Sequence, residues 1–169
     1  MNYLLSVGSN LCNRINFIHN AVKELVNFGK IDCISTIYET KPWGFTGENQ
    51  QEDYLNLCLL IQSNLAPSEF IITCQEIEKK LGRIRTIPWA SRTIDIDIIL
   101  IDDKIIDLPN LVVPHPRMHL RNFVLVPASE ICGSKYHPLF KKTLYELKQQ
   151  SKDTSQVHFY GKLILNNLE

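Results

Sequence analysis

The strongest strand signal in this sequence is Thr93-Ile94-Asp95-Ile96-Asp97-Ile98-Ile99-Leu100-Ile101. Side chains on a β-strand point alternately to the two faces of the sheet, so Asp95 and Asp97 share one face and the isoleucines around them point into the core. The two aspartate Cα atoms would lie roughly 6.5–7 Å apart. The pair could be an ordinary exposed polar face. Aspartate is depleted in strands, however, which favours a functional role.

Two carboxylates at this spacing are suited to divalent cations. The two Mg²⁺ ions of a two-metal site lie about 3.5–4 Å apart. Mg²⁺ takes few carboxylates from the protein and completes its coordination shell with water and substrate phosphate. Asp95 and Asp97 can therefore hold a pair of Mg²⁺ ions together with a phosphorylated substrate.

The arginines gather around this strand. Five of the six lie between positions 83 and 121, whereas the 12 lysines are spread from position 23 to position 162. Arginine is favoured over lysine where planar, bidentate binding of phosphate is needed. Solubilising surface charges would be dispersed. The clustering therefore indicates a site for metal ions and polyphosphate.

The elements predicted on either side of the strand over 93–101 fall into a regular order. They are a strand over 3–7, a helix between the Gly8-Ser9-Asn10 turn and Gly29, strands over 31–38 and 54–62, and a helix over 66–82. Apolar residues at helical spacing mark both helices. This β-α-β-β-α-β order predicts a ferredoxin-like α+β sandwich, with helices on one face of an antiparallel sheet and the other face free to bind a ligand. Further helices are expected over 123–128 and 139–150, and a last strand over 157–165.

Length and composition limit the class of protein. At 169 residues, the chain is expected to form a single domain over 1–169, with about 133–169 as a less certain C-terminal extension. Lys+Arg and Asp+Glu both number 18, and this balance argues against a nucleic-acid-binding or membrane-surface protein. No signal peptide or run of about 20 apolar residues is present. We expect a cytoplasmic protein.

The cysteines point to a reducing compartment. None lies at C-x-x-C spacing and they sit in apolar stretches, so they are predicted to be small buried side chains, with a reactive thiol as the lesser alternative. They are Cys12, Cys33, Cys58, Cys74 and Cys132.

Other candidate residues are weaker when taken singly. His115, between Pro114 and Pro116, could donate to a phosphate or act as an acid or base, although a lone histidine is more often structural. Gln75 and Glu78 share one helix face, for which exposure to solvent is the default. The Gly8-Ser9-Asn10 turn permits close backbone approach, but the chain has no G-x-x-x-x-G-K-[ST] motif and is not a P-loop enzyme. Aromatic residues near the loops could pack or stack on a flat heterocycle.

Taken together and in order, these segments resemble the 6-hydroxymethyl-7,8-dihydropterin pyrophosphokinases of folate biosynthesis. The resemblance spans about positions 3 to 132. The segments that carry it are Ser6-Val7-Gly8-Ser9-Asn10-Leu11, Tyr38-Glu39-Thr40-Lys41-Pro42-Trp43-Gly44, Asp53-Tyr54-Leu55-Asn56, Gln75-x-x-Glu78-x-x-x-Gly82-Arg83-x-Arg85, Trp89-x-x-Arg92-Thr93-Ile94-Asp95-Ile96-Asp97, and Pro114-His115-Pro116-Arg117-Met118-x-x-Arg121-x-Phe123-Val124-Leu125.

The resemblance implies a ferredoxin-like fold, ATP as co-substrate and two Mg²⁺ ions. It implies transfer of the β,γ-pyrophosphoryl unit to the pterin hydroxymethyl group with release of AMP. Asp95 and Asp97 would hold both metals, and Arg83 and Arg92 would neutralise the transferred unit. The nucleotide and phosphate residues would be Gln75, Glu78, Ile98, His115, Arg117 and Arg121, with Arg85 and Trp89 on a mobile loop that closes over ATP. The pterin pocket would be Gly8, Thr40, Pro42, Trp43, Tyr54, Asn56 and Phe123, where Tyr54 and Phe123 sandwich the ring and Asn56 pairs with its edge.

The loop over 85–91 departs from the family pattern. Thr86 and Pro88 stand where members often carry basic residues, Ala90-Ser91 replaces the usual Gly-Pro, and the loop is one residue shorter. Closure over ATP is therefore expected to differ. Some relatives are fused to other enzymes of the pathway, so contact with neighbouring folate-pathway enzymes is expected, while the oligomeric state is left open.

Two alternative functions are weighed against this one. Metal-dependent nucleotidyltransferases also combine a Gly-Ser turn with D-x-D, but their turn lies shortly before the acidic pair. Here Gly8-Ser9 precedes Asp95 by more than 80 residues. A non-catalytic ferredoxin-like binding module would need neither the acidic pair nor the arginine cluster.

Overall fold

The computed structural model describes residues 1–44, 51–84 and 91–164. In chain order the elements are β1 (Asn2–Ser9), α1 (Arg14–Val26), β2 (Lys30–Ile34), β3 (Ile37–Thr40), β4 (Tyr54–Gln62), α2 (Pro67–Lys80), β5 (Asp95–Ile101), β6 (Ile106–Leu108), β7 (Leu111–Val113), the 3-10 helix η1 (Met118–Leu120), α3 (Asn122–Cys132), β8 (Tyr136–His137), β9 (Lys142–Thr143), α4 (Leu144–Gln149) and β10 (Val157–Gly161).

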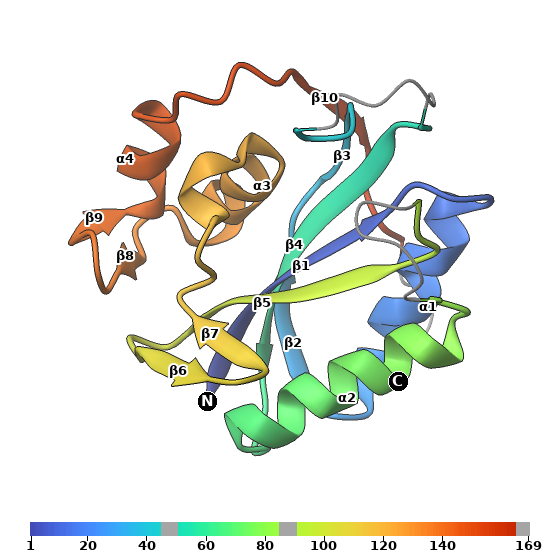
Figure 1. The fold of residues 1–169 in the computed structure, drawn as a ribbon, viewed down its shortest axis with the longest axis horizontal. Helices are drawn as coiled ribbons and strands as arrows, with labels where there is room; N and C mark the ends of the chain where they lie inside the picture. Colours follow the sequence, from blue (N-terminus) through green and yellow to red (C-terminus); the bar gives the residue numbers. More distant parts are fainter. Residues whose placement is uncertain (45–50, 85–90, 165–169) are drawn as a thin grey trace.

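An antiparallel sheet organises the molecule (Figure 1). Its strand order is β10-β3-β4-β1-β5, and β2 also pairs with β4. The first six predicted elements appear in the expected order, which confirms the α+β ferredoxin-like fold class. Small hairpins β6–β7 and β8–β9, which the sequence did not predict, lie outside this sheet.

One face of the sheet is sealed by α1 and α2. Their apolar stripes, which include Ile18, Val22, Phe70 and Ile77, pack on alternate residues of the strands to form the larger core. Local chemistry fixes where these helices begin. The Asn13 side chain accepts from the Asn16 amide of α1, and α2 begins with proline, whose missing amide hydrogen is not needed there.

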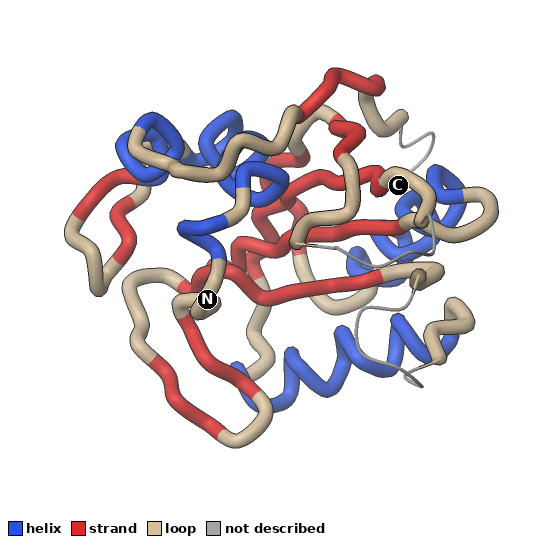
Figure 2. Tube along the Cα trace, turned by 45° about the horizontal axis from the view of Figure 1, so that its top comes forward, coloured by secondary structure: helices blue, strands red, loops and turns tan. Residues whose placement is uncertain are grey.

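The other face is half covered, which corrects the expectation that it is free. Helix α3 packs across β4, β3 and β1 and forms a second apolar cluster with residues such as Leu4, Cys58 and Leu125. In Figure 2 the helices accordingly form groups on either side of the sheet strands. The end of this face that carries Asp95, Gly8 and Asn56 opens into a cleft among the described residues.

The predicted strand over 31–38 is two strands, because side-chain bonds at Ser35 and Thr36 interrupt the regular ladder. The Ser35 hydroxyl donates to the Thr36 carbonyl at 2.7 Å and accepts from the Cys58 amide at 2.9 Å. The Thr36 amide donates to Glu130 of α3. The Ser35 amide still donates to the Cys58 carbonyl at 2.9 Å, but the Thr36 amide bonds to a side chain instead of β4, and the strand breaks between β2 and β3.

Towards the C-terminus the predicted boundaries are wrong in detail. The helix expected over 123–128 runs to Cys132, and the helix expected over 139–150 shortens to α4, where Thr143 forms a capping box with Glu146. The strand expected over 157–165 ends at Gly161. Among the described residues no helix has the length and apolar character needed to cross a membrane.

The cysteine prediction holds only in part. Cys58 and Cys74 are buried, whereas Cys33 and Cys132 are half-buried and Cys12 is exposed. Cys12 lies in the turn before α1 with a φ of 56°, outside both the strand and the helix, and this position explains why it is not in the core.

Candidate active site

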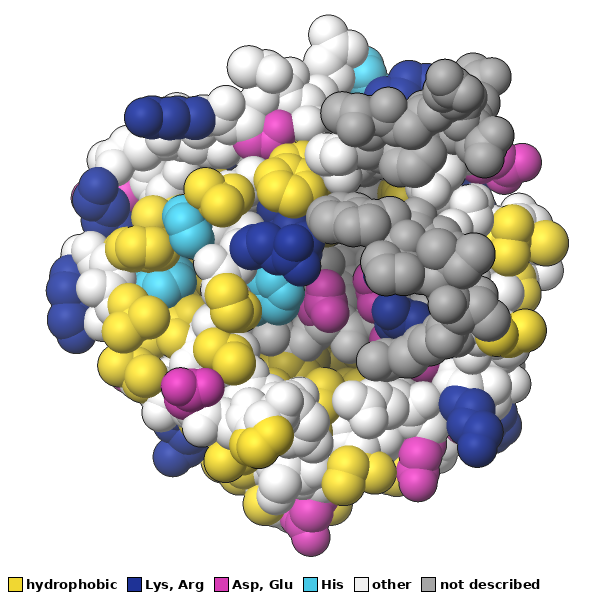
Figure 3. Space-filling view, in the orientation of Figure 1, with side chains coloured by type: hydrophobic (Ala, Val, Ile, Leu, Met, Phe, Trp, Pro, Cys, Tyr) yellow, Lys and Arg dark blue, Asp and Glu magenta, His cyan; other side chains and the backbone are white. Residues whose placement is uncertain are grey.

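A cleft opens on the half-covered face of the sheet. The space between its walls amounts to about 680 Å³, including that at its open mouth. The lining residues are Ser6, Gly8, Thr40, Lys41, Pro42, Trp43, Gln51, Tyr54, Asn56, Arg92, Asp95, Asp97, Arg121 and Phe123. Figure 3 shows acidic side chains in the central hollow of this face, with basic and histidine side chains beside them.

Strand register places the acidic pair beside the inner end of the cleft. Asp95 is paired with Gly8, and Asp97 with Ser6, across β5 and β1. Gly8 is paired on its other side with Asn56 of β4. A Cβ on residue 8 would lie 2.8 Å from Asn56 Oδ1, so glycine is needed for this amide to lie over β1.

Asn56 is oriented by β3. Its Nδ2 donates to Thr40 Oγ1 at 2.9 Å, and both side chains are buried. That bond uses the amide nitrogen as donor and leaves Oδ1 as an acceptor. The side chain can therefore recognise a ring N–H at the edge of a flat ligand.

The two aspartates differ in their surroundings. Asp95 accepts from Arg83 and, at 2.5 Å, from Arg92. Asp97 is paired with Ser6 through its backbone, and its carboxylate makes no hydrogen bond or ion pair within the part of the chain that the structure describes. Burial and the neighbouring charge of Asp95 raise its pKa to about 7. A cation between the carboxylates would relieve both effects. The oxygen donor set also suits Mg²⁺.

Arg83 is held from two sides. It donates to Asp95 and to Glu78 of α2. Glu78 is only 2% exposed and also accepts from the Ile96 amide at 2.7 Å. The expectation that Glu78 lies on a solvated helix face is therefore wrong. Its carboxylate joins α2 to β5 beside the acidic pair.

Arg121 lies between two aromatic rings at the far side of the cleft. Its Cζ is 5.0 Å from the centroid of the Trp43 ring and 5.5 Å from that of Phe123. Arg121 is 8% exposed, and its buried Nε has no hydrogen-bond partner among the described residues. Burial and the nearby charge of Arg117 lower its pKa. A buried, incompletely paired guanidinium is suited to an anionic ligand.

The comparisons with known proteins agree with this geometry. A profile of the 7,8-dihydro-6-hydroxymethylpterin-pyrophosphokinase (HPPK) family matches residues 4–133. The chain belongs to this family. It is 40% identical over 147 residues to the 2-amino-4-hydroxy-6-hydroxymethyldihydropteridine pyrophosphokinase of Aquifex aeolicus, covering 87% of this chain and 90% of that protein. The protein of the same name from Haemophilus influenzae is 33% identical over 155 residues, with 90% and 94% covered.

Solved HPPK structures share the fold. The chain matches wild-type HPPK-DHPS of Plasmodium falciparum with pteroate with a TM-score of 0.71 at 15% identity. The match covers 88% of this chain and 42% of that one, so the chain spans less than half of the longer protein. It likewise covers 43% of the bifunctional protein FolKE of Lactococcus lactis, to which it is 37% identical over 153 residues.

The cleft gathers most of the HPPK site residues expected from the sequence. All seven predicted pterin residues line it, together with Asp95, Asp97, Arg92 and Arg121. Gln75 is half-buried on α2, and the Ile98 side chain is buried in the core. Arg85 and Trp89 lie outside the described residues.

His115 and Arg117 lie next to the cleft without lining it. His115 Nδ1 accepts from the Arg117 amide at 3.2 Å. Burial and the charges of Arg121 and Arg117 lower the pKa of His115 to about 4. The imidazole is therefore neutral at pH 7 with its proton on Nε2, and it can donate a hydrogen bond from that atom.

Several residues of the site carried no assigned role in the sequence. Ser6, Lys41 and Gln51 line the cleft. Asn10 is fully buried and ties two segments to β1: its Oδ1 accepts from the Arg92 amide at 2.8 Å and its Nδ2 donates to the Glu52 carbonyl at 3.3 Å. Asn10 belongs to the Ser6–Leu11 segment of the family resemblance, but an asparagine in a turn gives no local indication of such distant partners.

Proposed function

We propose that this chain transfers the β,γ-pyrophosphoryl group of MgATP to 6-hydroxymethyl-7,8-dihydropterin, giving the pterin diphosphate and AMP. The pterin hydroxyl oxygen forms a bond to the β-phosphorus, and the bond from that phosphorus to the α,β-bridging oxygen breaks. The hydroxyl proton passes to solvent and AMP departs with the bridging oxygen. The observation that carries the proposal is that one cleft joins an acidic pair to an aromatic pocket with an oriented amide.

The pterin would occupy the part of the cleft near β3 and α3. Tyr54 and Phe123 are proposed to enclose the ring, and Asn56 Oδ1 to accept from a ring N–H. Gly8, Thr40, Pro42 and Trp43 are proposed to complete the pocket. Thr40 already orients the Asn56 amide, so ring recognition needs no rearrangement of this pair.

Asp95 and Asp97 are proposed to hold two Mg²⁺ ions. The fit rests on their common face and their oxygen donors, together with the raised pKa of Asp97, which is caused first by burial and then by the charge of Asp95. Bound Mg²⁺ would supply charge neutralisation for the phosphate oxygens. Arg83 and Arg92, which contact Asp95, are proposed to act on the transferred group in the same way.

The nucleotide is proposed to lie toward α2 and the segment over 114–121. The residues assigned to it are Gln75, Glu78, Arg85, Trp89, Ile98, His115, Arg117 and Arg121. Phosphoryl transfer requires chiefly positioning and charge stabilisation. The neutral His115 would accordingly serve as a hydrogen-bond donor.

We further propose that residues 1–169 act as one pyrophosphokinase domain in the cytoplasm and contact neighbouring enzymes of folate synthesis. Support for such contact comes from relatives in which an HPPK region is part of a bifunctional chain.

A product assay tests the proposal. The protein is incubated with MgATP and freshly reduced 6-hydroxymethyl-7,8-dihydropterin, and nucleotide products are separated. AMP formation that depends on the pterin is expected. Release of pyrophosphate would instead indicate a nucleotidyltransferase, and absence of turnover by folded protein would refute the assignment.

A further inference from the structure

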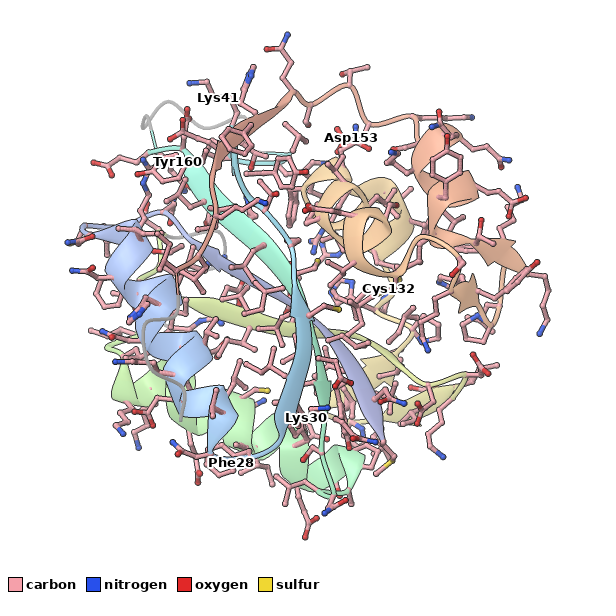
Figure 4. The ribbon with its side chains drawn as sticks, turned by 180° about the vertical axis from the view of Figure 1, so that it is seen from behind. Phe28, Lys30, Lys41, Cys132, Asp153 and Tyr160 are labelled. Carbon is pink, nitrogen blue, oxygen red and sulfur yellow. The ribbon has the colours of Figure 1, made fainter. Side chains whose placement is uncertain are left out.

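The segment after α4 crosses the molecule next to the pterin end of the cleft. It is extended over 151–156 and then forms β10, which pairs with β3. We call residues 151–161 the C-terminal strap. Figure 4 shows Asp153 on the part of the strap between α4 and β10, beside α3. The strap lies after the region matched by the family profile and after every site residue named above.

The strap supplies the cap that α3 lacks. The residue before this helix is Arg121, which makes no side-chain capping bond, and the first turn carries no acid. Instead, Asp153 Oδ2 accepts from the Asn122 amide at 2.7 Å, and Asn122 Nδ2 donates to the Asp153 carbonyl at 2.6 Å. A carboxylate at a helix N-terminus satisfies an otherwise unpaired amide and interacts favourably with the helix dipole.

This cap lies next to two residues of the cleft. Arg121 and Phe123 flank Asn122 directly, and both line the cleft. Asp153 is itself fixed within the strap, because its Oδ1 accepts from the Ser155 amide at 2.9 Å and from the Ser155 hydroxyl at 2.5 Å. The Asp153 carboxylate therefore fixes the N-terminus of α3, where Phe123 lies, relative to the strap.

The strap also holds the opposite wall of the pocket. Val157 of β10 is paired with Thr40 of β3, whose hydroxyl orients Asn56. Helix α3 and the β3 region are also joined directly, because Glu130 of α3 accepts from the Thr36 hydroxyl at 2.9 Å and from the Tyr38 hydroxyl at 3.1 Å. The strap, α3 and β3 thus each contact the other two beside the pterin end of the cleft.

We infer that the C-terminal strap is part of the pterin site and that Asp153 is a positioning residue, which sets the distance between the Phe123 wall and the Thr40–Asn56 wall. The inference rests on the proposed function, because it concerns the pocket assigned there to the pterin. It predicts selectivity: loss of the cap loosens the pterin pocket more than the site of the acidic pair, because Arg83 and Arg92, which contact Asp95, lie outside the strap and α3.

The test is direct binding by the full chain. Isothermal titration calorimetry measures the Kd of 6-hydroxymethyl-7,8-dihydropterin and, separately, of a non-hydrolysable MgATP analogue. For Asp153→Ala we expect the pterin Kd to rise about five- to thirtyfold, with the full free energy of a helix cap as the upper limit. The nucleotide Kd should rise less, because Arg121 is the one residue assigned to the nucleotide that is adjacent to Asn122 in the sequence. Asp153→Asn, which keeps one acceptor oxygen, should give an intermediate pterin Kd. Asp107→Ala on exposed β6 is the matched control and should change neither.

The outcomes distinguish failure of the proposed function from failure of the role given to the strap. Wild-type protein that neither binds the pterin nor forms AMP refutes the proposed function and, with it, the role of the strap. If wild type binds and reacts, an unchanged pterin Kd in Asp153→Ala refutes the strap alone, as does equal weakening for both ligands. Should Asp153→Ala fail to fold, Asn122→Ala removes only the bond to the Asp153 carbonyl and should raise the pterin Kd about two- to fivefold.

Discussion

Replacing Glu78 tests the idea that a buried carboxylate joins α2 to the strand of the acidic pair. In Glu78→Ala the buried Ile96 amide loses its acceptor, and Arg83 keeps Asp95 as its one carboxylate partner among the described residues. An unpaired buried amide costs about 1–3 kcal/mol, and removing one partner of a buried ion pair costs about 3–5 kcal/mol. Because Arg83 retains Asp95, we expect a total loss of about 3–5 kcal/mol in the free energy of unfolding.

Two further variants sharpen this prediction. Glu78→Gln keeps an acceptor for the Ile96 amide but exchanges charge-assisted bonds for neutral ones, so its loss should be smaller, about 1–2 kcal/mol. Glu76→Ala changes an exposed glutamate on the same helix and should stay within about 0.5 kcal/mol of wild type.

The measurement is urea-induced unfolding followed by far-UV circular dichroism, with the slope compared among variants so that changes in midpoint report stability. A Glu78→Ala protein as stable as the Glu76→Ala control would refute the reasoning. The Ile96 amide would then have found another partner, and Glu78 would be free to act on the nucleotide alone.

Three further changes probe other parts of the molecule. Asp97→Ala should lower turnover at least about a hundredfold by removing a metal ligand, while exposed Asp103→Ala stays near wild type in the AMP assay; near-wild-type turnover in Asp97→Ala would overturn the metal assignment. Gly29→Ala would place a Cβ 2.3 Å from the Gln62 carbonyl oxygen and should lower unfolding free energy by about 1–3 kcal/mol, and an unchanged urea midpoint would contradict this. Burial lowers the pKa of His137 to about 4, so the unfolded chain takes up a proton there first and stability falls as pH drops from 6.5 toward 4. The side chain in His137→Asn cannot titrate in that range, so the urea midpoint of this variant should fall less than that of wild type between pH 7 and 4.5. A fall equal to that of wild type would contradict the role given to His137.

The core of the fold could be predicted because its signals are local and periodic. Alternation in the strand over 93–101 predicted that Asp95 and Asp97 share a face, and the register with β1 confirms a common side that opens into the cleft. The break between β2 and β3 could not be predicted in this way. Thr36 is a good strand former and a single serine does not mark a break, whereas what separates the strands is the bonding of Ser35 and Thr36 to Cys58 and Glu130, far away in the chain.

The candidate site was predictable to a similar degree. Residues such as Asn56 and Phe123 stood in quoted motifs, and the structure brings them to the same cleft. Asp153 gave no comparable signal, because a single acid in a polar stretch is ordinary surface composition. Its partner, the Asn122 amide, lies 31 residues earlier. The need for a cap is visible only once α3 is seen to begin after an arginine that makes no capping bond.

The placement of charge would account for the proposed binding of both metal ions and polyphosphate by a chain with equal numbers of acidic and basic residues. Arg83 and Arg92 both contact Asp95, so positive and negative groups of the site stabilise each other within the protein. Mg²⁺ would replace the arginines as the partner of the carboxylates, and polyphosphate would replace Asp95 as the partner of the guanidinium groups, so binding would leave no charge unpaired. Each incoming ligand then frees the group that the other ligand needs, because the cation releases the arginines and the phosphate releases Asp95. Such reciprocal exchange makes binding of metal and polyphosphate mutually favourable, since a ligand arriving alone must leave one set of partners unpaired.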